Sequence, residues 1–387
     1  MIQPLFKSKK KDFEMFFGYI LPFIVVFTIL VFVHELGHYW VARSFGVAIE
    51  TFSIGFGPEI FGWTDKAGTR WKISIIPFGG YVKFLGDADA SSRPDGSKLE
   101  ALSEEDKSRS MHAKPPFQRI LISAAGPIAN YLLAIAIFFL LFSTVGQRHI
   151  TAKISKFSEN SAAQEAGLQI GDIIKSINGD SIKTFSDIEK SVKLNSNVPL
   201  NMIIDRAGTQ MSLTVTPKEI EEETAKGDKK KVGRLGIESP EIQYVQHNVF
   251  TALYAAVGET FSLSCQMLSG IWQMITGNKN AGEMVGVIGM GNMLGKALEI
   301  GLPMLVWLMA VLSINLGLIN LFPIPALDGG HILFYTIEMI LGRPISPKIQ
   351  ERTFMVGLLM ILGLTIYVNG NDLANLKVFS WIMSFFS

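Results

Sequence analysis

The strongest chemical signal in the sequence is the pattern HELGH at 34–38. Side chains four residues apart lie on one face of a helix, so the imidazoles of His34 and His38 can reach a single metal ion while Glu35 projects beside them. Imidazole pairs with this spacing suit zinc. Because the chain holds only 6 His, the odds of a chance match are below about one in a hundred. The alternative is two interfacial histidines and a helix-end glutamate without a metal.

A catalytic zinc usually has three protein ligands and an open position for water, so one more ligand must come from elsewhere in the chain. The single cysteine, Cys265, excludes a site of several thiolates and leaves histidine and carboxylate. Asp328 is the candidate, because Pro323 and Pro325 end the preceding helix and free the backbone to turn inward. An Asp-Gly turn without a metal is the alternative for Asp328. His331 is a weaker candidate, since a fourth protein ligand would fill the position that water needs.

Long apolar runs must position these residues. Hydrophobic residues make up 48% of the chain and charged residues 18%, with a mean hydropathy of +0.32, which is more apolar than soluble domains are. About 20 apolar residues cross a hydrocarbon core of about 30 Å. We therefore expect four transmembrane helices, with apolar cores at 16–33, 120–142, 302–322 and 354–368. The first run leads into HELGH without a cleavage site, so it is a span and not a signal peptide.

The charges predict how these spans are oriented. Eleven Lys and Arg lie from Arg43 to Arg119, and the loop at 343–352 adds three more. By the positive-inside rule both loops face the cytoplasm, although the basic cluster at 7–11 then lies outside, which the same rule disfavours. Three crossings bring Asp328 to the membrane face of the two histidines, so the three ligands can meet. A crossing at 250–275 would separate them, but its polar residues predict amphipathic surface helices instead.

A β region is expected between the first two spans. Residues 49–85 show strand-like alternation around a turn at 64–69, with further turns at 55–58 and 79–80. An edge of this sheet is a candidate to pair with an extended peptide, and the alternative is a hairpin that only packs against the spans.

Polar stretches elsewhere predict solvated segments. Residues 87–110 are expected to form a flexible linker and 219–231 a solvated loop. The remaining histidines, which are His112, His149 and His247, lie outside any metal spacing and are expected to be solvated.

Five segments together resemble the site-2 protease family (M50) of intramembrane zinc metalloproteases, most closely its bacterial RseP type. They are VHELGHYWVAR at 33–43, FSIGFGP at 52–58, IPFGGYVKFLG at 76–86, ISAAGPIANYLLA at 122–134 and NLFPIPALDGG at 320–330. The resemblance implies that His34, His38 and Asp328 bind Zn²⁺ and that Glu35 is the general base. It also implies that Asn320 and Pro323 handle the substrate.

A second resemblance concerns the region between the second span and the surface helices. The segment AGLQIGDIIKSINGDSI at 166–182 resembles a PDZ domain, and strand patterns extend around it over 150–240. PDZ domains can bind peptide ends by strand addition, and GRLGI at 233–237 can form part of such a groove. A steric filter that excludes substrates by size is the favoured interpretation, and peptide binding is the alternative.

The expected fold is a polytopic α-helical membrane protein with four transmembrane helices, a membrane-associated β region and one inserted PDZ domain. Its expected parts are an N-terminal tail and first transmembrane helix with HExxH (1–44), a cytoplasmic or membrane-associated β region and linker (45–117), the second transmembrane helix (118–145), a periplasmic PDZ domain (150–240), amphipathic membrane-surface helices (248–300), the third transmembrane helix and metal-ligand loop (301–330), and the fourth transmembrane helix with a C-terminal amphipathic segment (342–387).

The resemblance implies an intramembrane zinc metalloendopeptidase of the bacterial inner membrane. Its expected partners are the lipid bilayer and single-span membrane proteins, which it would cut at site 2 in regulated intramembrane proteolysis, either an anti-sigma factor or remnant signal peptides. A net charge of +1 gives no pull toward nucleic acid. The sequence specifies neither the natural substrate nor the oligomeric state.

Two other functions compete with this one. A metal or proton transporter would use the His, Glu and Asp cluster as an ion path, but the sequence lacks an inverted repeat around the site. An inactive membrane-tethered PDZ scaffold is disfavoured by the intact HExxH and Asp328.

Overall fold

The computed structural model describes residues 16–89, 96–223, 229–239, 242–278, 282 and 284–375. The chain divides into two compact units. The first contains the described residues up to Phe139, then 253–267, and those from Met284 onward, and the second contains 140–252 and 268–283. The predicted N-terminal tail, with its basic cluster at 7–11, and the C-terminal amphipathic segment beyond residue 375 lie outside the described residues.

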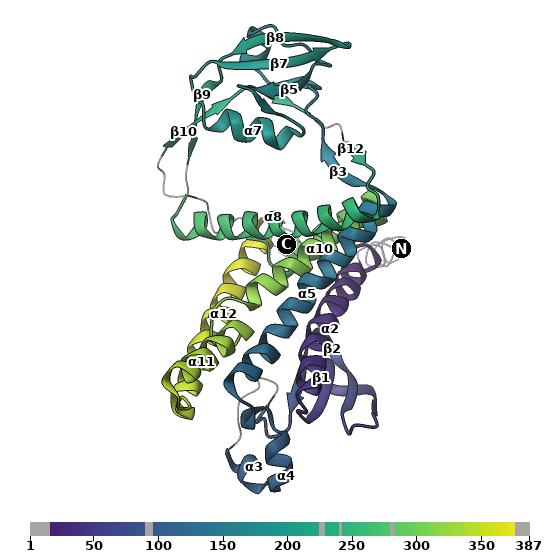
Figure 1. The fold of residues 1–387 in the computed structure, drawn as a ribbon, viewed down its shortest axis with the longest axis vertical. Coiled ribbons are helices and arrows are strands. Elements are labelled where there is room, and N and C mark those ends of the chain that lie inside the picture. The colour runs from purple at the N-terminus through teal and green to yellow at the C-terminus, as the bar shows by residue number, and fades with distance from the viewer. Residues whose placement is uncertain are drawn as a thin grey trace, which may run out of the picture. The chain divides into compact units, whose positions relative to one another are not determined.

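Within the described part of the chain, four helices are long and apolar enough to cross a membrane, as predicted. They are Gly18–Ser44, Pro116–Thr144, Leu302–Asn320 and Lys348–Ala374. The first joins a π-helix, η1 (Phe16–Ile20), to α2 (Leu21–Ser44), and the others are α5 (Pro116–Thr144), α10 (Leu302–Asn320) and α12 (Pro347–Asn375). Three of these helices extend beyond the predicted apolar runs, because polar residues at their ends continue the backbone hydrogen bonds. In Figure 1, α2, α5 and α10 run side by side.

The break after α10 lies where the prolines predicted it. The helix ends at Asn320, and α11 (Asp328–Leu341) begins at the candidate ligand itself. The intervening loop is packed tightly against the first turn of α11. A Cβ at Gly329 would lie 2.3 Å from the Phe322 carbonyl oxygen, and one at Gly330 would lie 2.5 Å from that of Ile324. Only glycine fits so close to backbone, so the two glycines after Asp328 allow the loop to present it.

Two further helices occupy 248–300, as expected. They are α8 (Val249–Ile275), whose first turn is capped by the Asn248 side chain, and α9 (Val287–Ile300). Of the helices in the described chain, α8 is not among those able to cross a membrane. It exposes several aromatic side chains, including Phe250, Tyr254 and Trp272. A location at the membrane surface remains a prediction.

The predicted β region consists of β1 (Ile49–Thr64) and β2 (Arg70–Phe84). Asp65 organises the turn between them, because its carboxylate accepts hydrogen bonds from the Ala67 and Thr69 amides at 2.9 and 3.0 Å. Residues 49–54 pair with both 70–73 and 80–84, while 56–64 pair with 70–76. The segment 80–84 is therefore an outer strand of this sheet among the described residues.

The chain reverses direction near the turns predicted at 55–58 and 79–80. Residues 51–54 pair with 70–73 in the same direction and with 80–83 in the opposite direction, whereas 61–64 pair with 70–73 in the opposite direction. The strand assignments of β1 and β2 nevertheless run through both positions with shifts in register. Gly55 and Gly79 have φ of 86° and 99°, a left-handed conformation that glycine adopts without steric cost. They bend the strands without ending them.

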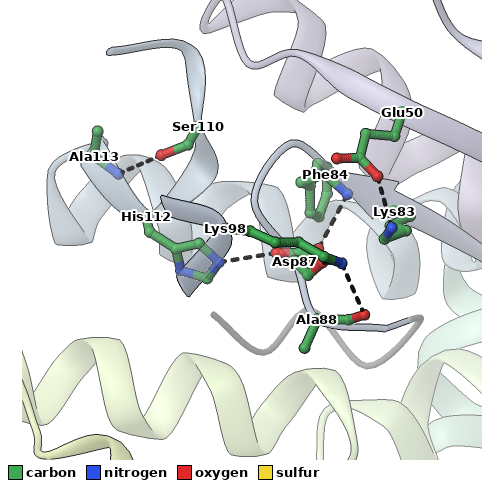
Figure 2. Close-up of polar contacts among 9 residues, drawn as sticks. All are labelled: Glu50, Lys83, Phe84, Asp87, Ala88, Lys98, Ser110, His112 and Ala113. Atoms are coloured by element: carbon green, nitrogen blue, oxygen red, sulfur yellow. Dashed lines mark hydrogen bonds and ion pairs between the residues drawn. The ribbon is translucent and has the colours of Figure 1, made fainter. Parts of the chain in front are cut away.

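The flexible linker predicted at 87–110 is wrong for its described residues. It contains α3 (Gly96–Ala101) and α4 (Glu104–Arg109), followed by a 3₁₀ helix, η2 (Met111–Ala113). Asp87 is fully buried and accepts hydrogen bonds from the Phe84 amide at 3.0 Å and from His112 Nε2 at 2.8 Å (Figure 2). Lys98 donates to the Asp87 carbonyl at 3.1 Å. His112 is therefore not solvated as expected, because it partners a buried carboxylate.

The second unit is rich in short strands. Its main sheet has the order β6 (Asp180–Ser181), β5 (Ile173–Ile177), β7 (Leu200–Arg206) and β8 (Thr209–Val215). Smaller pairs are β3 (Gln147–Ile150) with β12 (Ile242–Val245), β4 (Lys156–Phe157) with β11 (Ile237–Glu238), and β9 (Lys218–Glu223) with β10 (Lys229–Arg234). The helices are α6 (Ala162–Glu165) and α7 (Phe185–Lys193). A core of buried Ile, Leu, Val, Met and Ala side chains, including Ile154, Ile174 and Leu200, holds this unit together.

Two predictions fail in the second unit. The solvated loop expected at 219–231 forms most of β9 and β10, where an ion pair between Glu219 and Lys231, 2.7 Å long, bridges the strands. His149 and His247 are half-buried instead of solvated, and His247 Nε2 lies 3.2 Å from the Gln147 side-chain oxygen.

Candidate metal centre

The structure brings together the three residues proposed as ligands. The ligand atoms of His34, His38 and Asp328 all lie within 4.8 Å of one another. His34 Nε2 is 3.1 Å from Asp328 Oδ2, His38 Nε2 is 3.4 Å from Asp328 Oδ1, and the two Nε2 atoms are 3.3 Å apart. Both imidazoles are buried. Residues separated by about 290 positions in the sequence thus converge on one point.

This donor set fits a zinc ion. Nitrogen and oxygen ligands about 2.0–2.1 Å from a tetrahedral zinc lie about 3.3 Å from each other, which matches the three observed separations. Asp328 Oδ2 is buried and accepts no hydrogen bond from the described residues. A buried carboxylate oxygen normally has a partner, and a cation supplies one.

Both imidazoles are oriented by contacts from α5. His38 Nδ1 donates to the Ile122 carbonyl oxygen at 2.8 Å, which leaves Nε2 to bind a metal. The Asn130 side-chain nitrogen lies 3.1 Å from His34 Nδ1, and the Asn130 oxygen is buried with no hydrogen-bond partner among the described residues. If the side-chain amide is rotated by 180°, its oxygen accepts a hydrogen bond from the Nδ1–H group of His34. Asn130 then orients His34 in the way that the Ile122 carbonyl orients His38.

Sequence reasoning missed Asn130 as a site residue. The available signal was an asparagine inside an apolar span, where polar side chains usually have a function. The structure buries its side chain completely.

Small residues let α2 and α5 approach closely enough for these contacts. A Cβ at Gly126 would lie 2.3 Å from His38 Nε2 and 2.9 Å from His34 Cε1. A Cβ at Gly37 would lie 2.4 Å from the Ala125 carbonyl oxygen. The segments 33–43 and 122–134 therefore pack closely where each has a glycine. Small residues allow the same close approach between other membrane helices.

The cluster opens into a cavity of about 290 Å³ that Glu35 also lines. Gly80 and Val82 line the same cavity as Glu35, and a Cβ at Gly80 would lie 3.3 Å from Glu35 Cγ. The outer strand segment 80–84 thus lies directly against the candidate base.

Of the other predicted site residues, some line this cavity and some do not. Asn320 lines the cavity, whereas Pro323 lies in the loop after α10 and is not among the lining residues. His331 lines the cavity without belonging to the ligand cluster.

Comparisons with known proteins agree with this chemistry. Residues 22–364 match the model of Peptidase family M50. The chain is 40% identical over 363 residues to "Putative zinc metalloprotease Atu1380" of Agrobacterium fabrum, covering 93% of this chain and 96% of that protein. It is 36% identical over 387 residues to "Metalloprotease MmpA" of Caulobacter vibrioides, covering 94% and 97%. The PDZ domain of an SdrC-like protein from Listeria innocua is matched at 20% identity and a TM-score of 0.19, covering 24% of this chain and 98% of that one.

Two imidazoles on one helix, a distant carboxylate and an adjacent glutamate define a metalloprotease-type site. The chain belongs to Peptidase family M50, whose members depend on zinc. Together with the four apolar helices, this membership indicates a multi-pass protein of the inner membrane.

Proposed function

We propose that this protein is an intramembrane endopeptidase that makes the site-2 cut in single-span membrane proteins. The observation that carries the proposal is the convergence of His34, His38 and Asp328 beside Glu35. The first three of these residues along the chain, His34, Glu35 and His38, lie on α2, and Asp328 follows the loop after α10; both α2 and α10 are apolar enough to cross a membrane. Zinc held by these three residues supplies the Lewis acidity that activates water and polarises a peptide carbonyl. Glu35 accepts the proton of the attacking water and passes it to the leaving amine.

The substrate must be unwound before it is cut, because a membrane helix closes its backbone hydrogen bonds internally. The outer segment 80–84 supports strand addition as the way to hold the unwound chain. It pairs only with 49–54 among the described residues, and its Gly80 and Val82 line the cavity beside Glu35. An extended substrate beside this edge would lie next to the metal cluster. Asn320, with a donor and an acceptor in the same cavity, can bind further exposed amides. Pro323 would act by ending α10.

We also propose that 150–240 is a PDZ domain that receives peptide ends. A groove of about 270 Å³ in the second unit is lined by α7 and by the predicted segment 233–237. A Cβ at Gly233 would lie 2.3 Å from the Val192 carbonyl oxygen, so glycine is needed where the strand passes the end of α7. An anti-sigma factor cut once outside the membrane, or a remnant signal peptide, would present such an end. The alternative is a domain that filters substrates by size without binding them. A peptide-binding assay distinguishes the two, because only the proposed domain would bind a peptide end.

The test of the protease proposal is cleavage of a model single-span substrate by the purified protein in vesicles. Glu35→Gln is expected to abolish cleavage, because the amide cannot accept the proton. Glu104→Gln changes an exposed glutamate of α4 and is the matched control, expected to cleave as the wild type does. Cleavage by Glu35→Gln at the wild-type rate would remove the protease proposal and favour the transporter.

A further inference from the structure

A second cavity, of about 160 Å³, lies between α2, α9 and α10. Its walls are apolar except for the amide of Asn315. Phe27 and Leu316 line both this cavity and the one that holds the metal cluster. The two cavities therefore adjoin across these side chains, so a peptide bound in the first lies close to the second.

The position of this cavity along α2 relates it to the substrate sequence. Leu30, Phe27 and Phe23 precede His34 by four, seven and eleven residues. At about 1.5 Å per residue these side chains lie about 6 to 16 Å from His34 along the helix axis. An extended peptide advances about 3.3 Å per residue. The cavity thus lies about two to five peptide residues from the cluster, toward the start of the span.

The chemistry of the cavity points to an apolar side chain as its occupant. An apolar cavity of about 150 Å³ can hold a benzene ring, so a side chain the size of Leu, Met or Phe fits this one. Hydrolysis requires water in the metal cavity, and unwinding turns apolar side chains of the substrate toward that water. Entry into the adjoining apolar cavity removes such a side chain from water, which is favourable.

One wall of the cavity is held firmly by a cap from α12. Met290 belongs to that wall on α9. Asp372 accepts hydrogen bonds from the Gly286 and Gly289 amides at 2.9 and 2.8 Å, and so fixes the first turn of α9. A fixed wall discriminates between side chains by size, because it cannot yield to a larger one.

We propose that this cavity, here called the apolar subsite, binds a Leu-, Met- or Phe-sized side chain of the substrate, two to five residues from the scissile bond. The proposal rests on the protease function and names a residue preference for it. Met290 sets the size of the side chain that the apolar subsite accepts.

The experiment uses the full-length protein with zinc in vesicles and a series of single-span substrates. Each position within five residues of the cut carries Ala, Leu or Phe in turn. At one position between two and five residues away, the wild type is expected to cleave the Leu or Phe substrate with a kcat/KM about tenfold above that for Ala. Met290→Trp fills the apolar subsite and should bring this ratio close to one. Met290→Ala enlarges the subsite and should shift the preference toward Phe.

Met355→Trp is the matched control, because Met355 is an exposed side chain on α12. It should keep the wild-type preference. If Met290→Trp and Met290→Ala both keep it too, the subsite does not receive the substrate and the proposal is overturned. If Met290→Trp also fails to cleave the Ala substrate, the test rests on Met290→Ala. A substrate preference of Met290→Ala equal to that of the wild type then overturns the proposal. Failure of the protease function is a different result, in which Glu35→Gln cleaves every substrate as the wild type does.

Discussion

At the scale of single residues, the metal centre depends on side chains that would never touch the metal. His34 and His38 each present Nε2 to the cluster because α5 occupies their Nδ1 side. The His38 contact is a backbone carbonyl, which no substitution removes, whereas the His34 contact is the Asn130 side chain. Of these two orienting contacts, only the one from Asn130 can be removed by a substitution.

Asn130→Leu is expected to weaken zinc binding by about 10- to 100-fold, the usual cost of losing such a supporting contact. The leucine leaves His34 Nδ1 without a partner, so the tautomer and ring orientation are no longer fixed. Competition with a chelator measures the affinity. Thr144→Val, at an exposed position of the same helix, should bind zinc as the wild type does. Equal affinities for wild type and Asn130→Leu would show that His34 is positioned by other means.

How much of the centre could be predicted differs from residue to residue. The spacing of HELGH predicted a helical imidazole pair, and two prolines predicted the break before Asp328; the structure has both features. The role of Asn130 depends on which helix packs against His34, and one apolar sequence does not reveal that. His112 was misjudged because its partner, Asp87, lies 25 residues away and is buried by the folding of the whole segment.

At the scale of elements, α11 matters most, because it begins with the candidate ligand Asp328. A buried ion pair fastens this helix to α5. Arg119 Nη2 lies 2.7 Å from Glu338 Oε2, and the guanidinium carbon of Arg119 is 4.5 Å from the centre of the Tyr335 ring. The Glu338 carboxylate also accepts a hydrogen bond at 3.0 Å from the Ile345 amide in the loop before α12. One side chain therefore couples α5, α11 and the start of α12.

Glu338→Ala is expected to destabilise the protein by about 3–5 kcal/mol, since Arg119 would be left buried without a counter-charge. Thermal unfolding in detergent measures the loss. The double variant Arg119→Met with Glu338→Leu removes both charges and should recover most of the stability. A single variant as stable as the wild type would show that the ion pair does not hold α11.

The elements themselves were predictable to different degrees. Apolar runs predict the four long helices well, because few soluble elements are so uniformly apolar. Strands β1 and β2 were predicted, but their continuation through Gly55 and Gly79 was not, since a glycine that bends a strand has the same sequence signal as one that ends it. The β9 and β10 pair escaped prediction because its residues are charged, and a charged run resembles a solvated loop.

At the scale of the whole molecule, the decisive feature is the number of crossings between the two halves of the centre. The helix α8 is not among the described helices long and apolar enough to cross a membrane, so only α5 and α10 cross between His34, near the end of α2, and Asp328. Two crossings return the chain to the same membrane face. The observed convergence of these residues agrees with that count. The composition of 250–275 was enough to predict this, although a bend or a break in α8 was not excluded by sequence.

The positive loops predict that the active site lies near the cytoplasmic face and the 150–240 region in the periplasm. Cysteine labelling of intact cells tests this orientation. In a Cys265→Ser background, which removes the single native thiol, Ser108→Cys should be labelled only after the inner membrane is opened. Asp180→Cys should be labelled from the periplasm. The reverse pattern would invert the proposed topology.

The zinc content of the purified protein tests the central claim most directly, because the claim is that three distant residues hold one ion. The wild type and Glu35→Gln are each expected to carry about one zinc per chain, since Glu35 is not a ligand. Asp328→Ala is expected to lose most of it, because two imidazoles alone bind zinc weakly. One zinc per chain in Asp328→Ala, with an affinity equal to that of the wild type, would contradict the account.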